Sequence, residues 1–387
     1  MSQTTFASFR TRFPLLARRV YVNSCSQGAL SLDVEEANQR FLETWHRDGS
    51  PWDAWVAEVD RLRDVVAVAI GASPDEVTIA PSASVALSAL ASALDFSGPR
   101  RRVVMGRFEF PTMGHVWLAQ ARRGADVHWV DGDGDRMPVS AYVTAIDDRT
   151  LVVPATHVSY RNGYRVDVPA LTAACHAHGA YVLLDDYQRT GTAPLEVHDL
   201  GVDFLVTGAL KYLLGAAGIA FLYVRRDLID RLEPAVTGWF GRVDPFAFRP
   251  DVLDWPPTSR RFEAGTPPVP SAYMARAGIE LLASLGWQAI DDRINALTAR
   301  LLQGLHRSGF ECLTPDVRAE RGPLTVVHST DPATLLERLS ARGIVASTRG
   351  QGLRIALHAY NTEEDVDVVL EALDEERALL VPAPTAV

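Results

Sequence analysis

Residues 181–185 read YVLLD, residues 203–207 read DFLVT, and Lys211 follows shortly after the second segment. Both segments are short, apolar and rich in branched side chains, which predicts buried strands. Similar segments lie at 77–80 (VTIA), 102–105 (RVVM), 127–130 (VHWV), 151–156 (LVVPAT) and 219–224 (IAFLYV). Helical patterns occur at 53–70, 84–94, 113–123 and 168–178. This alternation predicts an α/β fold with a mainly parallel sheet, covered by helices on both faces.

The pattern changes at residues 234–270, which are rich in Pro, Gly, Trp and Phe. Beyond them, expected helices at 271–285, 289–308 and 363–379 and expected strands at 324–328 (LTVVH) and 353–357 (LRIAL) predict a smaller α+β domain. A chain of 387 residues suits one large and one small domain. We expect an N-terminal segment (1–50) that packs on the small domain, a large domain (51–255) and a small C-terminal domain (256–387).

The composition narrows the class of protein. The chain is 47% apolar and 22% charged, with a net charge of −10, which disfavours nucleic acid and anionic membranes as partners. No apolar stretch is long enough to cross a bilayer, and the N-terminus lacks the pattern of a secretory signal. Cys25, Cys175 and Cys312 are an odd, widely spaced set, which argues against a disulfide framework. We therefore expect a cytoplasmic protein.

The basic residues are unusual, because the chain has 37 arginines and a single lysine, Lys211. Arginine can replace lysine as a solvated charge or an ion-pair partner, but it cannot lose its proton and become an amine nucleophile. A lone lysine therefore suggests amine chemistry, above all a Schiff base. A lysine that survived by chance on the surface would give the same count, so composition alone does not decide.

Three chemical groups follow strands of the predicted sheet, where ligands bind in open α/β folds. Asp185 ends its strand, and a buried carboxylate needs a partner, which is a protonated ring nitrogen, a helix N-terminus or a salt bridge. Residues 81–84 (PSAS) open a helix, where backbone N–H groups bind anions or a serine simply caps the helix. Together with Lys211, these groups fit the ring nitrogen, phosphate and aldehyde of pyridoxal 5′-phosphate (PLP).

An ordered series of segments carries a family resemblance. It comprises 110–112 (FPT), 157–163 (HVSYRNG), 171–179 (LTAACHAHG), 184–188 (LDDYQ), 211–215 (KYLLG), 238–241 (GWFG), 244–246 (DPF), 261–267 (RFEAGTP), 353–355 (LRI) and 360–365 (YNTEED). Over residues 20–375 the series resembles the class V aminotransferase family, which has the fold type I PLP-dependent transferase architecture. Within that family it is most similar to kynureninase, with some features of cysteine desulfurases.

The resemblance implies roles for individual residues. Lys211 would hold PLP and then serve as the acid and base at the substrate Cα, while Asp185 would pair with the ring nitrogen. Arg354 would bind the substrate α-carboxylate, and Gln27 would be a second substrate-binding residue. The other implied cofactor contacts are Gln188 to the ring O3′, Phe110 stacked on the ring, and Ala83, Ser84, Thr207, Trp239 and Thr266 around the phosphate. Without the resemblance, Phe110 is equally an ordinary core residue and Trp239 an interface residue.

The resemblance also implies an amino-acid substrate and a homodimer with its active site at the subunit interface, where Thr266 comes from the neighbouring subunit. Leu210 departs from the family, because kynureninases have a phosphate-binding tyrosine there and desulfurases have histidine; Thr207 would compensate. Ser159 stands where asparagine is usual. Residues 215–218 (GAAG) replace the more common Gly-Gly-Pro-Gly.

The implied reaction passes through a carbanion at Cα and then cleaves or rearranges the side chain at a β or γ position. The alternatives are an aminotransferase, an epimerase and a non-catalytic PLP-binding protein. Residues 347–352 contain none of the cysteine that desulfurases use to accept sulfur. Cys25 lies in a loop that approaches the active site in this family, and is either reactive or passive.

No metal site is expected. Residues 131–135 (DGDGD) resemble the start of a calcium loop, but Arg136 stands at the sixth position where glycine is required, and Tyr142 at the twelfth where glutamate is required. Cys175, His176 and His178 are neighbours on an expected helix, and such neighbours point in different directions. We interpret the first segment as a turn and the second as part of an ordinary helix.

Overall fold

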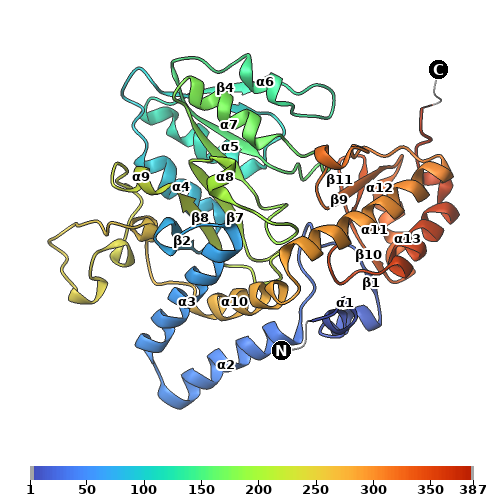
Figure 1. Ribbon diagram of the computed structural model, residues 1–387, viewed down its shortest axis with the longest axis horizontal. Helices are drawn as coiled ribbons and strands as arrows, with labels where there is room; N and C mark the ends of the chain where they lie inside the picture. The colour runs from blue at the N-terminus through green and yellow to red at the C-terminus, as the bar shows by residue number, and fades with distance from the viewer. Residues whose placement is uncertain (1–3, 385–387) are drawn as a thin grey trace.

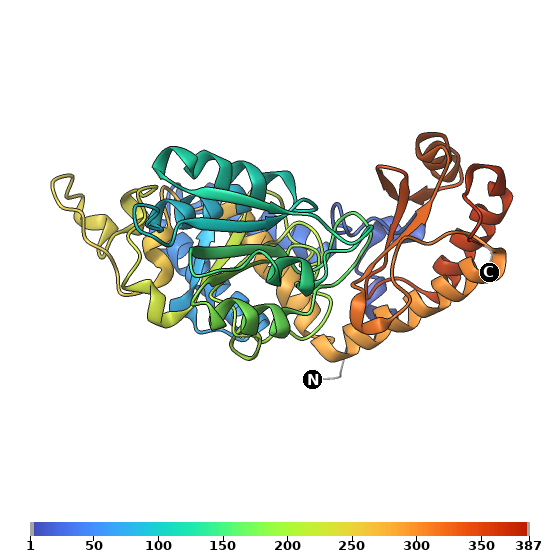
Figure 2. The same ribbon diagram turned by 90° about the horizontal axis from the view of Figure 1, so that it is seen from above.

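A computed structural model describes residues 4–384 and places them in two units that lie side by side (Figures 1 and 2). The strands are β1 (Val20–Tyr21), β2 (Val77–Ala80), β3 (Arg102–Gly106), β4 (Asp126–Val130), β5 (Thr150–Thr156), β6 (Tyr181–Asp185), β7 (Phe204–Gly208), β8 (Ala220–Val224), β9 (Leu324–His328), β10 (Ile344–Val345), β11 (Ser347–Arg349) and β12 (Gly352–Ala356). The α-helices are α1 (Phe6–Arg10), α2 (Leu32–Asp48), α3 (Trp52–Ile70), α4 (Ala83–Ala93), α5 (Pro111–Ala119), α6 (Val139–Val143), α7 (Val168–Ala177), α8 (Val197–Leu200), α9 (Arg226–Ile229), α10 (Val269–Ala283), α11 (Trp287–Ser308), α12 (Pro332–Ala341) and α13 (Glu363–Glu375).

The larger unit is built on a seven-stranded sheet with the order β2-β8-β7-β6-β5-β3-β4. The neighbours from β7 to β4 are parallel, whereas β8 runs antiparallel to both β2 and β7. The sheet is therefore mixed but mainly parallel, as predicted. Because β2 and β7 are both antiparallel to β8, they point the same way, and the ends of β2, β5, β6 and β7 meet along one edge.

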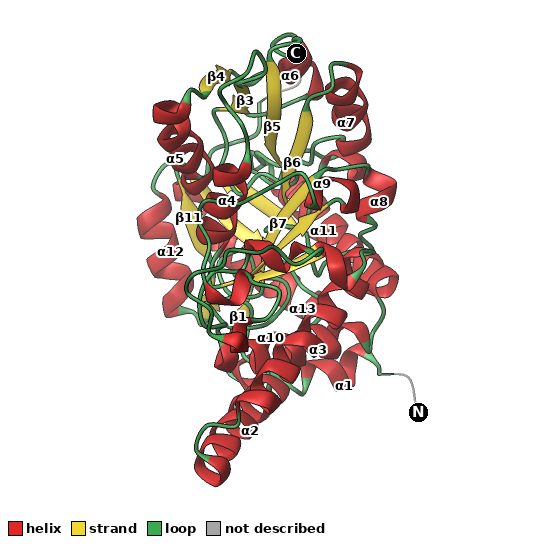
Figure 3. Cartoon of the chain, turned by 90° about the vertical axis from the view of Figure 1, so that its left-hand side faces the viewer, coloured by secondary structure: helices red, strands yellow, loops and turns green. Residues whose placement is uncertain are grey.

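Helices cover both faces of this sheet (Figure 3). One face packs against α3, α7, α8 and α10, and the other packs against α4, α5 and α9. Alternation along the strands divides them between the two cores: Leu184 and Leu205 belong to the first core, and Leu183 and Val206 to the second. Strands that are buried on both faces explain the nearly continuous apolar segments of the sequence.

The smaller unit contains the antiparallel sheet β11-β12-β9 together with α11, α12 and α13, around its own apolar core. The N-terminal segment contacts both units. Its strand β1 pairs in parallel with β10, and Arg10 forms an ion pair with Asp365 at 2.8 Å. Its helix α2 packs on α10 through Phe41, whose ring centroid lies 5.8 Å from that of Tyr273.

Every predicted strand is present, with ends that differ by at most one residue from those expected. The predicted helices are present too, and most of their ends lie within two residues of those expected. Helices α5 and α13 end four residues early: α5 passes into the 3-10 helix Gln120–Arg123, and α13 is followed by the 3-10 helix Arg377–Leu379. The helices α2 and α12 were not anticipated. Helix α10 follows the predicted boundary at residue 255, but its Ala272, Ala275 and Ile279 lie in the core of the larger unit. The boundaries of the domains stay a prediction.

Residues 236–254 form an arm that extends away from the larger unit (Figures 1 and 2). It contains the 3-10 helices η4 (Trp239–Gly241) and η5 (Pro245–Ala247). The arm exposes apolar side chains, among them Phe248 at 71% and Leu253 at 62%. Within the described residues, no helix is both long and apolar enough to span a membrane.

Candidate active site

A cavity of about 250 Å³ opens at the edge of the large sheet where the strand ends meet. It lies between the starts of α4 and α5, the ends of β5 and β6, and the loop after β7. Its lining residues are Ser82, Ala83, Ser84, Leu87, Phe110, Thr112, Met113, Thr156, Tyr160, Asp185, Tyr187, Gln188, Leu210 and Lys211. Six residues predicted for the site therefore share one cavity: Ala83, Ser84, Phe110, Asp185, Gln188 and Lys211.

Lys211 presents its amine to this cavity between two aromatic rings. Nζ lies 4.5 Å from the ring centroid of Tyr187 and 5.9 Å from that of Phe110. Burial lowers the pKa of Lys211 from its usual 10.5, and the nearby charge of Asp185 opposes that shift. The amine is therefore neutral, and nucleophilic, at a lower pH than a solvated lysine.

The loop that carries Lys211 is held from two directions. The N–H of Gly28 donates to the carbonyl oxygen of Leu210 at 2.8 Å. A Cβ on Gly28 would lie 2.5 Å from the carbonyl oxygen of Lys211, so only glycine allows this approach. From the smaller unit, His358 Nε2 lies 2.9 Å from the carbonyl oxygen of Tyr212, and His358 Nδ1 accepts the N–H of Ala359 at 2.7 Å. These contacts imply the Nε2–H tautomer, which donates to Tyr212.

Asp185 lies deep in the molecule but remains accessible from the cavity, because it ends β6 where the cavity begins. Its Oδ1 accepts the backbone N–H of Tyr187 at 3.0 Å. Burial raises the pKa of Asp185, while the Tyr187 N–H and the charge of Lys211 act against that rise. Among the residues that the structure describes, the carboxylate has one donor, and it faces a cavity, so a cationic N–H group placed there would stabilise it.

A second carboxyl group lies below the cavity. Glu109 Oε1 accepts the N–H of Thr156 at 3.2 Å and the hydroxyl of Tyr142 at 3.1 Å, and Oε2 also bonds the Thr156 hydroxyl. Burial raises the pKa of Glu109 to about 7. Thr156 is the register partner of Asp185, so both side chains are on the same face of the sheet. Glu109 was not predicted, because a glutamate before Phe110 has no pattern of its own in the sequence.

The start of α4 forms the wall opposite the lysine loop. Ser82 Oγ caps the helix by accepting the N–H of Val85 at 3.2 Å. Among the described residues, the N–H groups of Ala83 and Ser84 have no partner, and the Ser84 hydroxyl lies 3.1 Å from that of Thr112. Free N–H groups at the beginning of an eleven-residue helix, with two hydroxyl groups beside them, form a site for a phosphate.

Gln188 and Phe110 complete the cavity. Gln188 Nε2 donates to the carbonyl oxygen of Cys25 at 3.1 Å, while its Oε1 is buried with no partner among the described residues. Phe110 is partly exposed to the cavity, and its ring meets that of Tyr160 edge to face at 5.4 Å. The cavity thus offers a flat aromatic wall and an unsatisfied polar atom, both of which a planar polar ligand would use.

Arg354 reaches the same region from β12 of the smaller unit. Its guanidinium is 2% exposed and donates to Ser347 Oγ at 2.8 and 3.1 Å, to Ser26 Oγ at 2.8 Å and to the carbonyl oxygen of Tyr160 at 3.4 Å. No carboxylate of the described residues lies within 4 Å of it. Tyr160 also lines the cavity, so its contact with Arg354 places the guanidinium next to that cavity. A buried guanidinium held by hydroxyl groups is poised to bind an anion.

The family model "Aminotransferase class-V" matches residues 46–369, which is most of the chain. This chain belongs to the class V aminotransferase family. It is 34% identical over 369 residues to the uncharacterized aminotransferase YcbU of Bacillus subtilis (strain 168), covering 95% of this chain and 96% of that protein. It is 32% identical over 359 residues to a kynureninase of Deinococcus radiodurans, covering 88% of this chain and 85% of that protein.

The solved structures of similar fold include cysteine desulfurases. The apo structure of cysteine desulfurase from Thermococcus onnurineus NA1 has a TM-score of 0.85 at 21% identity, covering 98% of this chain and 99% of that one. A complex of the cystine C–S lyase C-DES with cysteine persulfide has a TM-score of 0.85 at 21% identity, covering 96% of this chain and all of that one. These similarities establish the fold type I architecture.

As a class V enzyme the protein depends on PLP, and the cavity fits that cofactor. Among residues 4–384 the Asp185 carboxylate forms no ion pair, the free N–H groups of α4 suit the phosphate, and the orphaned Oε1 of Gln188 suits a polar ring substituent. Lys211 is the one amine side chain in the sequence, and it lies between these groups.

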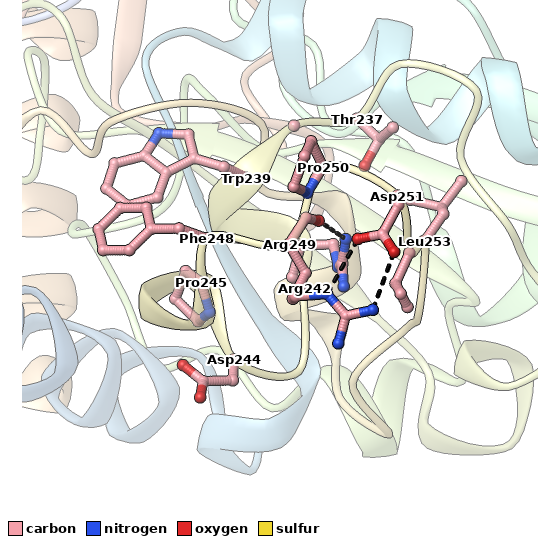
Figure 4. Close-up of a pocket in the computed structure, with 12 residues that line it drawn as sticks. Thr237, Trp239, Arg242, Asp244, Pro245, Phe248, Arg249, Pro250, Asp251 and Leu253 are labelled. Atoms are coloured by element: carbon pink, nitrogen blue, oxygen red, sulfur yellow. Dashed lines mark hydrogen bonds and ion pairs between the residues drawn. The ribbon is translucent and has the colours of Figure 1, made fainter.

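Five predicted site residues do not line this cavity: Arg354, which contacts its Tyr160, and four others. Trp239 lies in the arm, where its ring stacks on Phe248 at 6.0 Å beside an open groove (Figure 4). Thr266 and Gln27 are exposed and do not line the cavity. Thr207 is 1% exposed, and alternation along β7 directs it to the sheet face opposite Asp185. The replacement of a phosphate contact by Thr207 therefore has no support in this geometry.

Several site residues were missed by sequence reasoning. Thr112 follows Phe110, and Tyr187 lies within the 184–188 segment, so position in those segments was a usable signal. Ser26 and Ser347 hold Arg354 but are ordinary serines in the sequence, and only the fold brings them together.

Proposed function

We propose that this class V enzyme acts on an α-amino acid and cleaves or rearranges its side chain at a β or γ position. The observation that carries the proposal is that Lys211 and Asp185 share one cavity of the larger unit, and that Arg354 of the smaller unit contacts Tyr160, which lines the same cavity. The kynureninase relatives support side-chain cleavage, since their similarity covers most of the chain. No cysteine occurs on the β11–β12 hairpin, which disfavours sulfur transfer of the desulfurase type.

Each residue has a role that follows from its surroundings. PLP, when bound, supplies an electron sink for negative charge that develops at the substrate Cα. Asp185 would hold the protonated ring nitrogen, and Phe110 would provide an aromatic contact to the ring. Lys211 would attach the cofactor and then move the proton at Cα, for which its lowered pKa suits it. Arg354 fixes the substrate α-carboxylate, and Ser26 and Ser347 fix Arg354.

An aminotransferase is the second candidate, favoured by the name of the Bacillus subtilis relative. Both candidates use the same residues up to the removal of the Cα proton. They differ in whether the side chain leaves or the amino group stays on the cofactor. The products therefore distinguish them.

We also propose that the enzyme is a cytoplasmic homodimer. The arm around Trp239 exposes Val243, Phe246, Phe248 and Leu253, which a second copy would cover. In such a dimer, Trp239 and Thr266 would approach the partner's cavity. The three cysteines are free, in keeping with a reducing compartment. A mass in solution close to 42.3 kDa, that of one chain, would contradict the dimer.

The test compares the wild type with Lys211→Ala and Lys211→Arg, the second of which keeps the charge but supplies no amine nucleophile. Borohydride treatment followed by mass spectrometry should find PLP on Lys211 of the wild type and on neither variant. Both variants should lose turnover by about 10²–10⁴-fold or more. Release of a side-chain fragment supports the first candidate, and formation of a 2-oxo acid with the side chain intact supports the second. Normal turnover by Lys211→Ala would contradict both.

A further inference from the structure

The β11–β12 hairpin places a second arginine on the face that carries Arg354. In the antiparallel register, Ser347 is opposite Arg354, and Arg349 is opposite Gly352. Side chains alternate along strands, so these four positions share one face. The hydrogen bonds from Arg354 to Ser347 Oγ confirm which face this is. Arg349 is therefore diagonal to Arg354 on the face from which Arg354 contacts Tyr160, a residue that lines the cavity.

Arg349 has no internal counterion. Its side chain is exposed, and Nη1 donates to the carbonyl oxygen of its own neighbour Thr348 at 2.9 Å. Among residues 4–384, no carboxylate lies within 4 Å of either Arg349 or Arg354. Gly352 opposite it has no side chain that would cover the guanidinium. Arg349 is thus free to contact a ligand that occupies the site.

The charge of Arg349 acts on two groups of the proposed site, Arg354 and Lys211. It lowers the pKa of Arg354 and also that of Lys211. Like charges so close together, without a compensating anion, are unfavourable, and the unfavourable energy falls when anions bind between them. One carboxylate satisfies Arg354. Arg349 is a second cation beside Arg354, which implies that the ligand carries a second anionic group. The protein as a whole has a net charge of −10, so two unpaired cations at one place are a local exception.

We propose that Arg349 binds an anionic side-chain group of the substrate, so that this enzyme prefers acidic amino acids. The inference rests on the function proposed above, in which Arg354 binds the α-carboxylate. Arg349 is then a specificity-determining residue: it selects the side chain and takes no part in the proton transfer. Its planar guanidinium suits a carboxylate, which it can bind with two parallel hydrogen bonds.

The experiment uses the PLP-loaded full chain and two pairs of nearly isosteric amino acids, glutamate with glutamine and aspartate with asparagine. Binding is followed by the change in cofactor absorbance, which gives an apparent Kd. The wild type should bind at least one acid on the order of 10- to 100-fold more tightly than its amide, the range expected for charge-assisted hydrogen bonds. Arg349→Gln should reduce this ratio to about 2-fold by weakening the acid alone. The matched control is Arg122→Gln, at an exposed arginine of the larger unit that forms no ion pair among the described residues, and this variant should behave as the wild type.

The outcomes separate this inference from the proposed function. The inference fails if the wild type binds acid and amide with the same apparent Kd, or if Arg349→Gln weakens the binding of both equally. In either case Arg349 does not bind the substrate side chain, while the proposed function stands. If no amino acid perturbs the cofactor of the wild type, the proposed function itself fails.

Discussion

At the scale of single residues, Lys211 and Asp185 each change the pKa of the other. Burial favours the neutral form of both, which lowers the pKa of the amine and raises that of the carboxyl group. Each charge in turn stabilises the other. Such opposed shifts are common where one group must attack and another must stay charged. Burial therefore favours the neutral amine of Lys211, whereas the charge of Lys211 favours the ionised carboxylate of Asp185.

Asp185→Asn should leave the cofactor attached but reduce turnover by roughly 10²–10³-fold, because the amide cannot hold a protonated ring nitrogen. The same change removes the charge that raises the pKa of Lys211, so the pKa of the amine should fall further. Activity assays and the pH dependence of cofactor attachment measure the two effects. Asp199→Asn, at an exposed carboxyl group on α8, is the control. Unchanged turnover in Asp185→Asn would remove Asp185 from the mechanism.

Sequence reasoning predicted which candidate residues at strand ends lie together in the fold. It brought Lys211, Asp185 and the start of α4 to one edge, because parallel strands end together. It did not foresee the direction of Thr207, which depends on the exact register of β7. Nor did it foresee Glu109, whose buried position below Thr156 is a product of tertiary packing.

At the scale of elements, the loop after β7 is immobilised by close backbone contacts. Gly28 approaches the Lys211 carbonyl from the N-terminal segment, and Gly278 of α10 approaches the carbonyl of Leu213, where a Cβ would lie at 2.6 Å. The loop is therefore clamped between two segments far apart in the sequence. A clamped loop gives the amine a fixed position relative to Asp185, which proton transfer requires.

Gly28→Ala should displace this loop, because the new methyl group would lie 2.5 Å from the Lys211 carbonyl oxygen. We expect a loss of about 1–3 kcal/mol in the free energy of unfolding, as for other overpacked sites. Turnover should fall more than PLP content, since the amine is misplaced rather than lost. Chemical denaturation and activity assays check both. Gly98→Ala, with nothing within 4 Å of its Cβ, is the control. Equal stability of the two variants would contradict the close packing.

The elements themselves were largely predictable. Strands buried on both faces give continuous apolar segments, so their ends were located within one residue. Helix α2 was missed because it buries only a narrow stripe, Val34, Ala37 and Phe41, on an otherwise polar surface. The short strands β10 and β11 gave no usable pattern, because periodicity needs more residues than they contain.

At the scale of the whole molecule, the two units meet near Lys211. The larger unit supplies Lys211, and the smaller unit supplies Arg354 and His358. Burial lowers the pKa of His358 to about 4, while burial raises that of Glu109, in the larger unit, to about 7. These two neutral groups affect stability with opposite signs over the same range of pH.

The native state binds fewer protons at His358 than the unfolded state does between pH 4 and 6.5, so its contribution to stability is lost as the pH falls through that range. It binds more protons at Glu109 between pH 4.5 and 7, so stability is lost there as the pH rises. Relative to His358→Gln, the wild type should lose about 3 kcal/mol of its free energy of unfolding as the pH falls from 6.5 to 4. Relative to Glu109→Gln, the wild type should lose about 3 kcal/mol of its free energy of unfolding as the pH rises from 4.5 to 7. Urea denaturation of all three proteins from pH 4 to 7.5 measures this. Slopes of the same sign in the two comparisons would show that one of these groups is not buried in its neutral form.

The solitary lysine gives the enzyme a built-in isotopic reporter. Cells grown on lysine labelled at the ε position would place a single such label in each chain, at the atom expected to react. Its magnetic resonance signal would need no assignment, because no other side chain contributes one. The same sample would show the protonation of the amine, its attachment to the cofactor and its release by substrate, with no change to the sequence.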